Sequence, residues 1–132
     1  MSKFDIVLKS LAELKTVLEE KSITGVNKAG VSHANSLVDS GKVVKPTSWK
    51  APSAEEENAY IEKNGIEAFG KWHLGVDSKV DPKTKGHYGY IFTSDFKNVD
   101  RKAITAIKQR AGGQHQNDVL EAATKLLEKI DK

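Results

Sequence analysis

Two histidines and two aspartates lie within fifteen residues near the middle of the chain: His73, Asp77, Asp81 and His87. Imidazole and carboxylate groups are ligands that zinc or calcium accepts. However, Asp77 and Asp81 lack the Asp-x-Asp/Asn spacing and the closing Glu of a calcium loop, and two histidines alone do not complete a zinc site. We therefore predict that the chain holds no metal and needs no cofactor.

The sequence also contains no pattern of residues that indicates nucleophilic catalysis. The chain has no cysteine, no Gly-x-Ser-x-Gly elbow, and no serine placed by its spacing against a histidine. Phosphate binding by a glycine-rich loop is not indicated, because no such loop is followed by Lys-Ser or Lys-Thr. The sequence therefore predicts no catalytic residues and a protein that is not an enzyme.

Positive charge gathers in the central part of the chain. The formal net charge is +3, but residues 70–116 carry nine Lys or Arg against four Asp, whereas the remainder is net negative. Such an asymmetry suits an acidic partner or nucleic acid. The candidate interaction residues share one expected helix and are Arg101, Lys102, Lys108 and Arg110.

DNA binding is the alternative that these residues leave open. Residues 101–111 and 117–130 are two expected helices joined by a short loop, as in helix-turn-helix proteins. The second helix carries Glu121, Glu128 and Asp131, and these carboxylates are a poor match to a phosphate backbone. We therefore rank a small basic DNA-binding protein second to a protein that binds other proteins.

Two stretches of alternating apolar and polar residues predict the strands that these helices pack on. Residues 71–76 and 87–93 alternate with a period of two, and a charged loop over residues 77–86 joins them. One sheet face is expected to carry the structural aromatic residues Trp72, Tyr88, Tyr90 and Phe92 together with Leu74. Trp49, between two prolines, is expected to plug one end of the core.

Helix signals surround these strands. Apolar spacing and end signals predict helices over residues 2–21, 32–40, 54–64, 101–111 and 117–130. Ser53 and Glu56 form a capping box, while Asp100 and Asn117 are expected to cap the last two helices. The predicted fold class is α+β, with about five short helices packed on a small two-stranded antiparallel sheet.

The N-terminal segment is expected to stand apart from the rest. Its apolar residues line one face of a helix, which either joins the core or forms a seam with a second copy of the chain: Phe4, Val7, Leu8, Leu11, Leu14 and Leu18. Residues 22–30 are expected to be a flexible connection, which divides the chain into 1–28 and 29–132. The charges within the apolar pattern argue against a signal peptide or membrane span, so we expect an intracellular protein.

A family resemblance rests on residues 29–49, on SAE at 53–55, on GKWHLGVD at 70–77, on KTK at 83–85, on YGY at 88–90 and on 99–111. With these motifs the chain, over residues 29–131, resembles a small domain of tailed-phage and prophage proteins that often accompanies head-maturation protease or capsid genes. One departure is that Ile91, not proline, follows Tyr90. The resemblance implies no protease residues.

The resemblance and the residues together favour a non-enzymatic structural or protein-interaction module of the phage type. The resemblance implies a link to capsid assembly, with phage head proteins as partners. Self-association through the N-terminal helix is the other expected mode of assembly. The expected location is the cytoplasm of a bacterial host or the virion.

Overall fold

The structure, a computed structural model, describes residues 23–132. The helix expected over residues 2–21 lies outside the described residues. The described part is α+β, with five helices, a three-stranded antiparallel sheet and a two-stranded parallel sheet. In chain order the elements are β1 (Gly25–Val26), α2 (Lys28–Asp39), β2 (Val43–Val44), α3 (Ala54–Asn64), α4 (Ile66–Gly70), β3 (His73–Val76), β4 (Tyr88–Ile91), β5 (Val99–Asp100), α5 (Arg101–Gly113) and α6 (Asn117–Ile130).

The antiparallel sheet has three strands in the order β1-β3-β4, not the two that the sequence predicted. Gly25 pairs with Val76, and Gly75 pairs with Gly89. The buried side chain of Ile23 lies over both Gly75 and Gly89, where an added Cβ would come within 3.0 Å of it. The flexible connection expected over residues 22–30 is therefore wrong for its described part, because Ile23 anchors the start of β1 in the sheet.

A second, smaller sheet was also missed. Strand β2 pairs in parallel with β5, and the amide of Val99 donates to the carbonyl of Lys42 at 3.0 Å. Gly41, just after α2, allows the chain to turn back, because its φ of +74° lies in the left-handed region that glycine adopts readily. A two-residue strand is too short to show alternating apolar and polar residues. The sequence of β2 or β5 alone therefore does not predict that the two strands pair.

The three-stranded sheet is covered on both faces, which corrects the expected half-buried strands. His73 is only 4% exposed and Gly75 is also buried. Phe69, from the unpredicted helix α4, packs on the His73 ring with centroids 4.6 Å apart. Tyr90 has φ of +62°, so regular alternation fails there as well.

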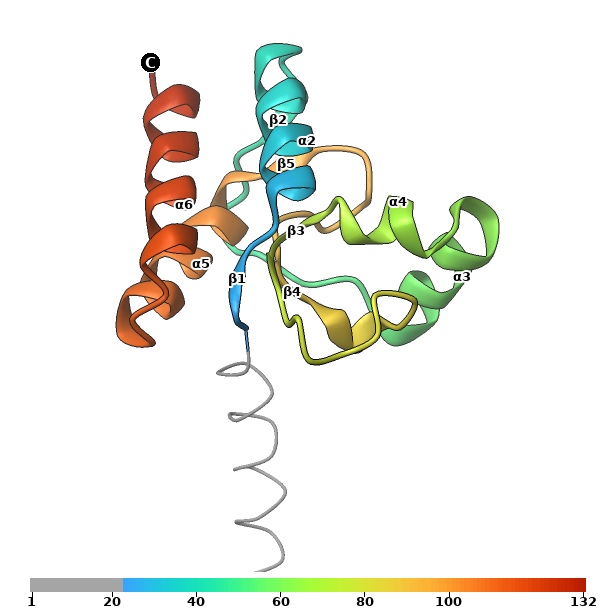
Figure 1. Cartoon of the computed structure of the whole chain (residues 1–132). Coiled ribbons are helices and arrows are strands. Elements are labelled where there is room, and N and C mark those ends of the chain that lie inside the picture. Colours follow the sequence, from blue (N-terminus) through green and yellow to red (C-terminus); the bar gives the residue numbers. More distant parts are fainter. Residues whose placement is uncertain (1–22) are drawn as a thin grey trace, which may run out of the picture.

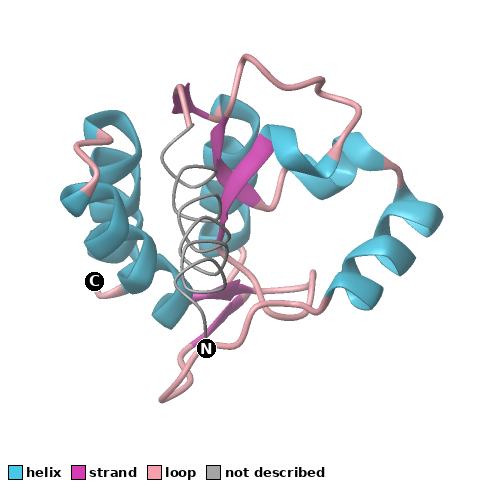
Figure 2. Cartoon of the chain, turned by 90° about the horizontal axis from the view of Figure 1, so that it is seen from below, coloured by secondary structure: helices cyan, strands magenta, loops and turns pink. Residues whose placement is uncertain are grey.

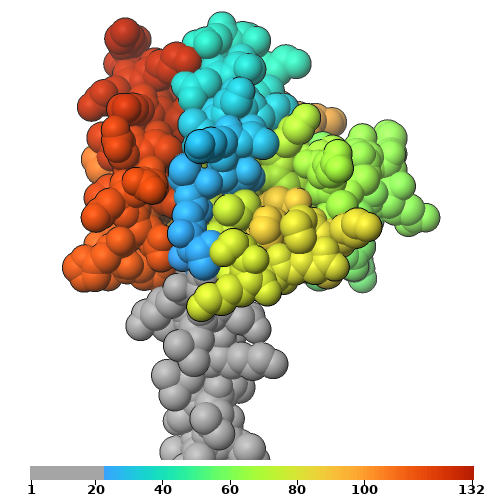
Figure 3. Space-filling model, in the orientation of Figure 1, coloured from blue at the N-terminus to red at the C-terminus, as the bar shows by residue number. Residues whose placement is uncertain are grey.

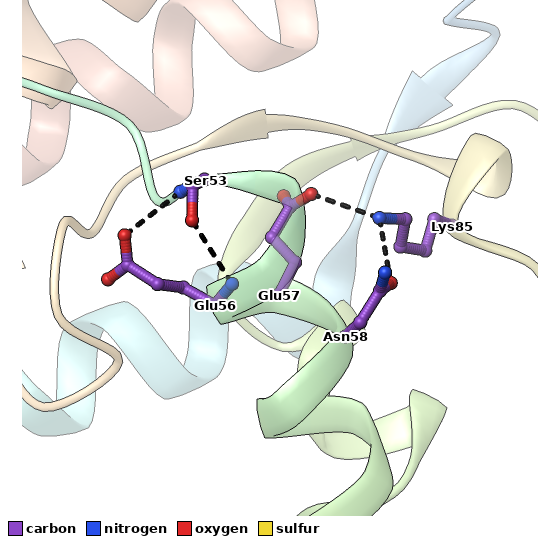
Figure 4. Close-up of polar contacts among 5 residues, drawn as sticks. All are labelled: Ser53, Glu56, Glu57, Asn58 and Lys85. Carbon is purple, nitrogen blue, oxygen red and sulfur yellow. Dashed lines mark hydrogen bonds and ion pairs between the residues drawn. The ribbon is translucent and has the colours of Figure 1, made fainter.

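Helix boundaries mostly follow the local signals. The capping box of α3 is confirmed: the Glu56 amide donates to Ser53 Oγ at 3.1 Å, and the Ser53 amide to Glu56 Oε1 at 3.2 Å (Figure 4). Asp100 caps α5 by accepting from the Ala103 amide at 3.0 Å. The predicted cap at Asn117 is wrong, because α6 begins at that residue and Gln116 precedes it without a side-chain cap.

The helices divide into two groups on opposite sides of the sheet (Figures 1 and 2). α2, α5 and α6 lie on one side, and α3 with α4 lies on the other. α3 buries none of its side chains fully, and its first turn is tied to the loop before β4 by Lys85 Nζ, 3.2 Å from Glu57 Oε1 (Figure 4). Within residues 23–132, no helix is long and apolar enough to cross a membrane.

Candidate functional site

The four basic candidate residues do not share one face of α5. At about 100° of rotation per residue, Arg101 and Lys108 lie near one another around the axis, while Lys102 and Arg110 point in other directions. Arg101 is engaged by α6: its Nε and Nη2 donate to the two carboxylate oxygens of Asp131 at 2.8 and 2.7 Å. Lys102 and Lys108 are exposed.

Arg110 packs against the aromatic core. Its guanidinium lies 5.4 Å from the ring centroid of Tyr90, a cation–π arrangement. The Tyr90 hydroxyl donates to Gln114 Oε1 at 2.7 Å. Arg110 is therefore half-buried on the opposite side of α5 from Arg101.

The aromatic residues separate into two groups. Trp72, Tyr90 and Phe92 belong to the main core, as expected. Tyr88 does not, because its ring packs beside Phe69 and His73, with centroids 6.3 and 5.8 Å away.

Trp49 lies half-buried outside this core. Its Nε1 donates to the carbonyl of Thr93 at 3.4 Å. The ring therefore contacts the segment after β4.

The side chains considered as metal ligands form hydrogen bonds with backbone groups. His73 Nδ1 lies 3.0 Å from the carbonyl of Phe69, and His87 Nδ1 lies 2.8 Å from that of Val80. Asp77 and Asp81 each accept from the amide two residues further on. Among residues 23–132, no group of three metal-capable side chains comes together.

His73 is the most perturbed of these groups. Burial of its imidazole lowers the pKa of His73 to about 4, although the hydrogen bond to the Phe69 carbonyl opposes part of that effect. The ring is neutral at pH 7 and packs against the rings of both Phe69 and Tyr88. Its role is structural packing of the second sheet face.

An open, partly apolar groove of about 410 Å³ lies between α2 and α6, and we call it the α2/α6 groove. Its lining residues come from β1, α2 and α6 and are Val26, Lys28, Val31, Ser32, Asp118, Glu121, Ala122 and Lys125. Figure 3 shows the strip of β1 and the start of α2, in blue, at the molecular surface between α6 and the β3–β4 region.

Polar contacts join α2 and α6 at the end away from the groove. Near their C-terminal ends, Lys129 Nζ lies 2.7 Å from Asp39 Oδ1 and 3.0 Å from Asn35 Oδ1. In their N-terminal halves the facing residues are short, with Ser32 on α2 and Ala122 on α6. Small side chains cannot fill the space between the two helices, so Val26 and Val31 remain half-exposed at its floor.

Charges of both signs surround this apolar floor. Glu121 and Lys125 form an ion pair at 2.9 Å on α6. Lys28 and Asp118 form no ion pair with any other described residue. The groove therefore offers an apolar strip with one positive and one negative group available beside it.

Sequence reasoning did not identify this groove. Val31 lies next to the helix expected over residues 32–40, and an apolar residue on the buried side of a helix is expected in the core rather than in a groove. The position of β1 between the two helices could not be anticipated from a stretch that contains two glycines and one asparagine.

Comparison with known proteins gives no match: no family model, no curated protein and no solved structure is similar to this chain. The phage-domain resemblance therefore stays a prediction.

Proposed function

We propose that this protein is a non-enzymatic, phage-type interaction module that binds an apolar segment of a protein partner in the α2/α6 groove. The observation that carries the proposal is the groove itself, with Val26, Val31 and Ala122 as an apolar floor and charges at its edges. Protein interfaces commonly combine an apolar centre with a polar rim. The sequence resemblance favours a phage head protein as the partner.

The chemistry of the groove describes the expected partner segment. Its anchors are aliphatic side chains, because the floor is formed by valine and alanine. A basic group of the partner would lie beside Asp118 and an acidic group beside Lys28, since each of these residues has no ion-pair partner among the described residues. The candidate basic helix plays no part in this contact, because α5 contributes no lining residue.

A binding titration tests the proposal. The full chain is titrated against the purified major head protein of the phage or prophage that encodes it, and Val31→Asp is compared with Ser36→Asp. Both changes add one carboxylate to α2, but Val31 lines the groove and Ser36 is exposed outside it. We expect Val31→Asp to weaken binding at least about tenfold, as loss of a buried anchor does, while Ser36→Asp binds like the parent.

Two results would contradict the proposal. No association of the parent chain at high micromolar concentration would argue against a head-protein partner. Equal binding by Val31→Asp and the parent, with both folded by circular dichroism, would place the interface elsewhere.

A further inference from the structure

We infer that a pocket between the end of α4 and the start of β4 binds a free α-amino acid with an aliphatic side chain. The pocket has a volume of about 300 Å³, and we call it the α4/β4 pocket. The β1–α2 junction and the end of β3 complete its walls. It shares no lining residue with the α2/α6 groove, so this is a second site beside that of the proposed function.

Asn27 supplies the pocket with a hydrogen-bond acceptor. It lines the pocket and is only 9% exposed. Its Nδ2 donates to the carbonyls of Gly70 and His73 at 2.9 and 3.0 Å, which uses both amide hydrogens and leaves Oδ1 as an acceptor. Oδ1 accepts no hydrogen bond from any group within residues 23–132, the amides at the start of α2 included. Because buried polar groups normally have a partner, a donor on a ligand would complete this one.

His87 supplies a second neutral acceptor. Its Nδ1 lies 2.8 Å from the carbonyl of Val80, so this nitrogen carries the hydrogen and donates it. In the neutral imidazole the other nitrogen, Nε2, is then an acceptor. No group in the described part of the chain donates to it. Two acceptors on one pocket suit a ligand group that carries several hydrogens, such as an ammonium.

The pocket also presents one charge of each sign. Glu67 on α4 and Lys71 just after it both line the pocket and are exposed. They lie four residues apart, in the order that favours an ion pair on a helix, yet neither forms an ion pair with any residue from 23 to 132. Burial, and then the nearby charge of Glu67, raise the pKa of Tyr88 above its usual value, which places this carboxylate near the Tyr88 hydroxyl. A ligand with an ammonium and a carboxylate matches the two charges.

The remaining wall of the pocket suits an aliphatic side chain. The Tyr88 ring is held against Gly70, where an added Cβ would lie 2.5 Å from the ring, and its hydroxyl donates to the Pro82 carbonyl at 3.0 Å. Ala29 and Val76 are the aliphatic residues of the lining. Small-molecule sites commonly combine such an apolar wall with a few polar groups that fix the ligand's orientation. The branched side chain of leucine fits this wall.

An NMR titration of the full, isotope-labelled chain tests the inference with three compounds that share one aliphatic skeleton. L-Leucine carries both charged groups, isoamylamine lacks the carboxylate, and isocaproate lacks the ammonium. The amide signals of Lys71, His87 and Tyr88 report binding at the pocket. We expect a dissociation constant on the order of 1 mM for leucine, because the charged groups of the pocket are exposed. Each of the other two compounds should bind about fivefold more weakly.

Two substitutions assign the charged groups. Glu67→Gln should weaken the binding of leucine and isoamylamine but not that of isocaproate. Lys71→Gln should weaken the binding of leucine and isocaproate but not that of isoamylamine. Both side chains are exposed, so we expect the fold to be kept. The matched controls, Glu62→Gln and Lys63→Gln, remove the same charges from exposed positions on α3 outside the pocket and should bind like the parent.

Three results would overturn the inference. The first is that leucine at its solubility limit leaves these amide signals unchanged, and the second is equal binding of the three compounds. The third is a loss of leucine binding that is as large in the α3 variants as in the pocket variants, since net charge would then account for it. The titration contains no head protein, so its failure leaves the proposed function standing, and failure of head-protein binding leaves this inference standing.

Discussion

The indole Nε1 of Trp72 donates a hydrogen bond to the hydroxyl of Tyr60 at 3.0 Å, which joins α3 to the residue that precedes β3. Tyr60 also stacks on Phe96, with centroids 4.3 Å apart. Because α3 has no fully buried side chain, these contacts hold it against the sheet. The position of α3 against the sheet therefore depends on few interactions.

Tyr60→Phe should destabilise the protein by about 1–3 kcal/mol, because it leaves the buried indole donor of Trp72 without its partner while the ring stack is kept. Tyr88→Phe is the control, since the Tyr88 hydroxyl donates to the Pro82 carbonyl in an exposed position, and should change stability by less than about 0.5 kcal/mol. Urea denaturation measures both free energies of unfolding. Equal values for the two variants would show that the Trp72–Tyr60 bond contributes nothing.

Trp72→Ala should cost about 3–5 kcal/mol, because it removes a large side chain that is only 4% exposed. The indole packs against Phe92, with ring centroids 5.7 Å apart, so the substitution leaves a cavity in the main core. Thermal denaturation followed by circular dichroism measures the loss. A melting temperature equal to that of the parent would contradict the burial of Trp72.

Gly30→Ala should destabilise the protein by at least about 3 kcal/mol, because its Cβ would lie 1.8 Å from the backbone carbonyl oxygen of His73. This close approach brings α2 onto β3, where Asn27 Nδ2 also donates to the His73 carbonyl at 3.0 Å. Gly112→Ala is the helical control, since its Cβ meets nothing closer than 3.9 Å. That variant should gain about 0.5–1 kcal/mol. Similar denaturation midpoints for the two variants would contradict the packing of α2 on β3.

The contrast between these sites shows what the sequence could predict. The capping box of Ser53 and Glu56 and the cap at Asp100 were predictable, because each satisfies amides of its own helix within three residues. The close contact of Gly30 with His73 was not, because it joins residues far apart in the sequence. Helix ends are local, whereas helix-to-sheet packing is set by the whole chain.

The strands illustrate the same limit. β3 and β4 were predicted from alternating residues, but β1 was expected to be a flexible connection, since a two-residue strand shows no period. The half-buried pattern failed at His73 because Phe69 covers the second face. One consequence is that removal of residues 1–28, the natural choice from sequence, would also remove β1. A test of the N-terminal segment has to end the deletion at residue 22.

His73 should make stability depend on pH. Its folded pKa is about 4, below its usual value of 6.5, so the unfolded chain binds a proton that the folded chain excludes between these values. The contribution of His73 to the free energy of unfolding is fully present above pH 6.5. It falls by an amount on the order of 3 kcal/mol as the pH falls toward 4. Below pH 4 the loss from this group stops.

The variant His73→Gln isolates this effect, because its amide can still donate to the Phe69 carbonyl but does not titrate in this range. We expect the stability difference between parent and variant to shift in favour of the variant as pH falls from 6.5 to 4. Urea denaturation at four pH values across this range measures it. A difference that stays constant with pH would show that His73 is accessible to protons in the folded protein.

The DNA-binding alternative makes a separate prediction about Lys102 and Lys108. Each phosphate contact adds about one unit to the slope of log affinity against log salt. Arg101 is already engaged by Asp131, and Arg110 lies over Tyr90 on another face of α5. The four basic residues therefore do not present a continuous surface to a duplex, and we expect no measurable binding even at low salt.

A duplex titration at low and moderate salt measures this directly. The double variant Lys102→Glu, Lys108→Glu is compared with Lys63→Glu, Lys79→Glu, which makes the same change in net charge at exposed positions on α3 and in the loop after β3. Micromolar binding by the parent that falls steeply with salt, is lost in the first variant and is kept in the second would establish α5 as a DNA-binding helix. Binding lost equally in both variants would reflect net charge alone, because a specific phosphate contact depends on where a lysine lies.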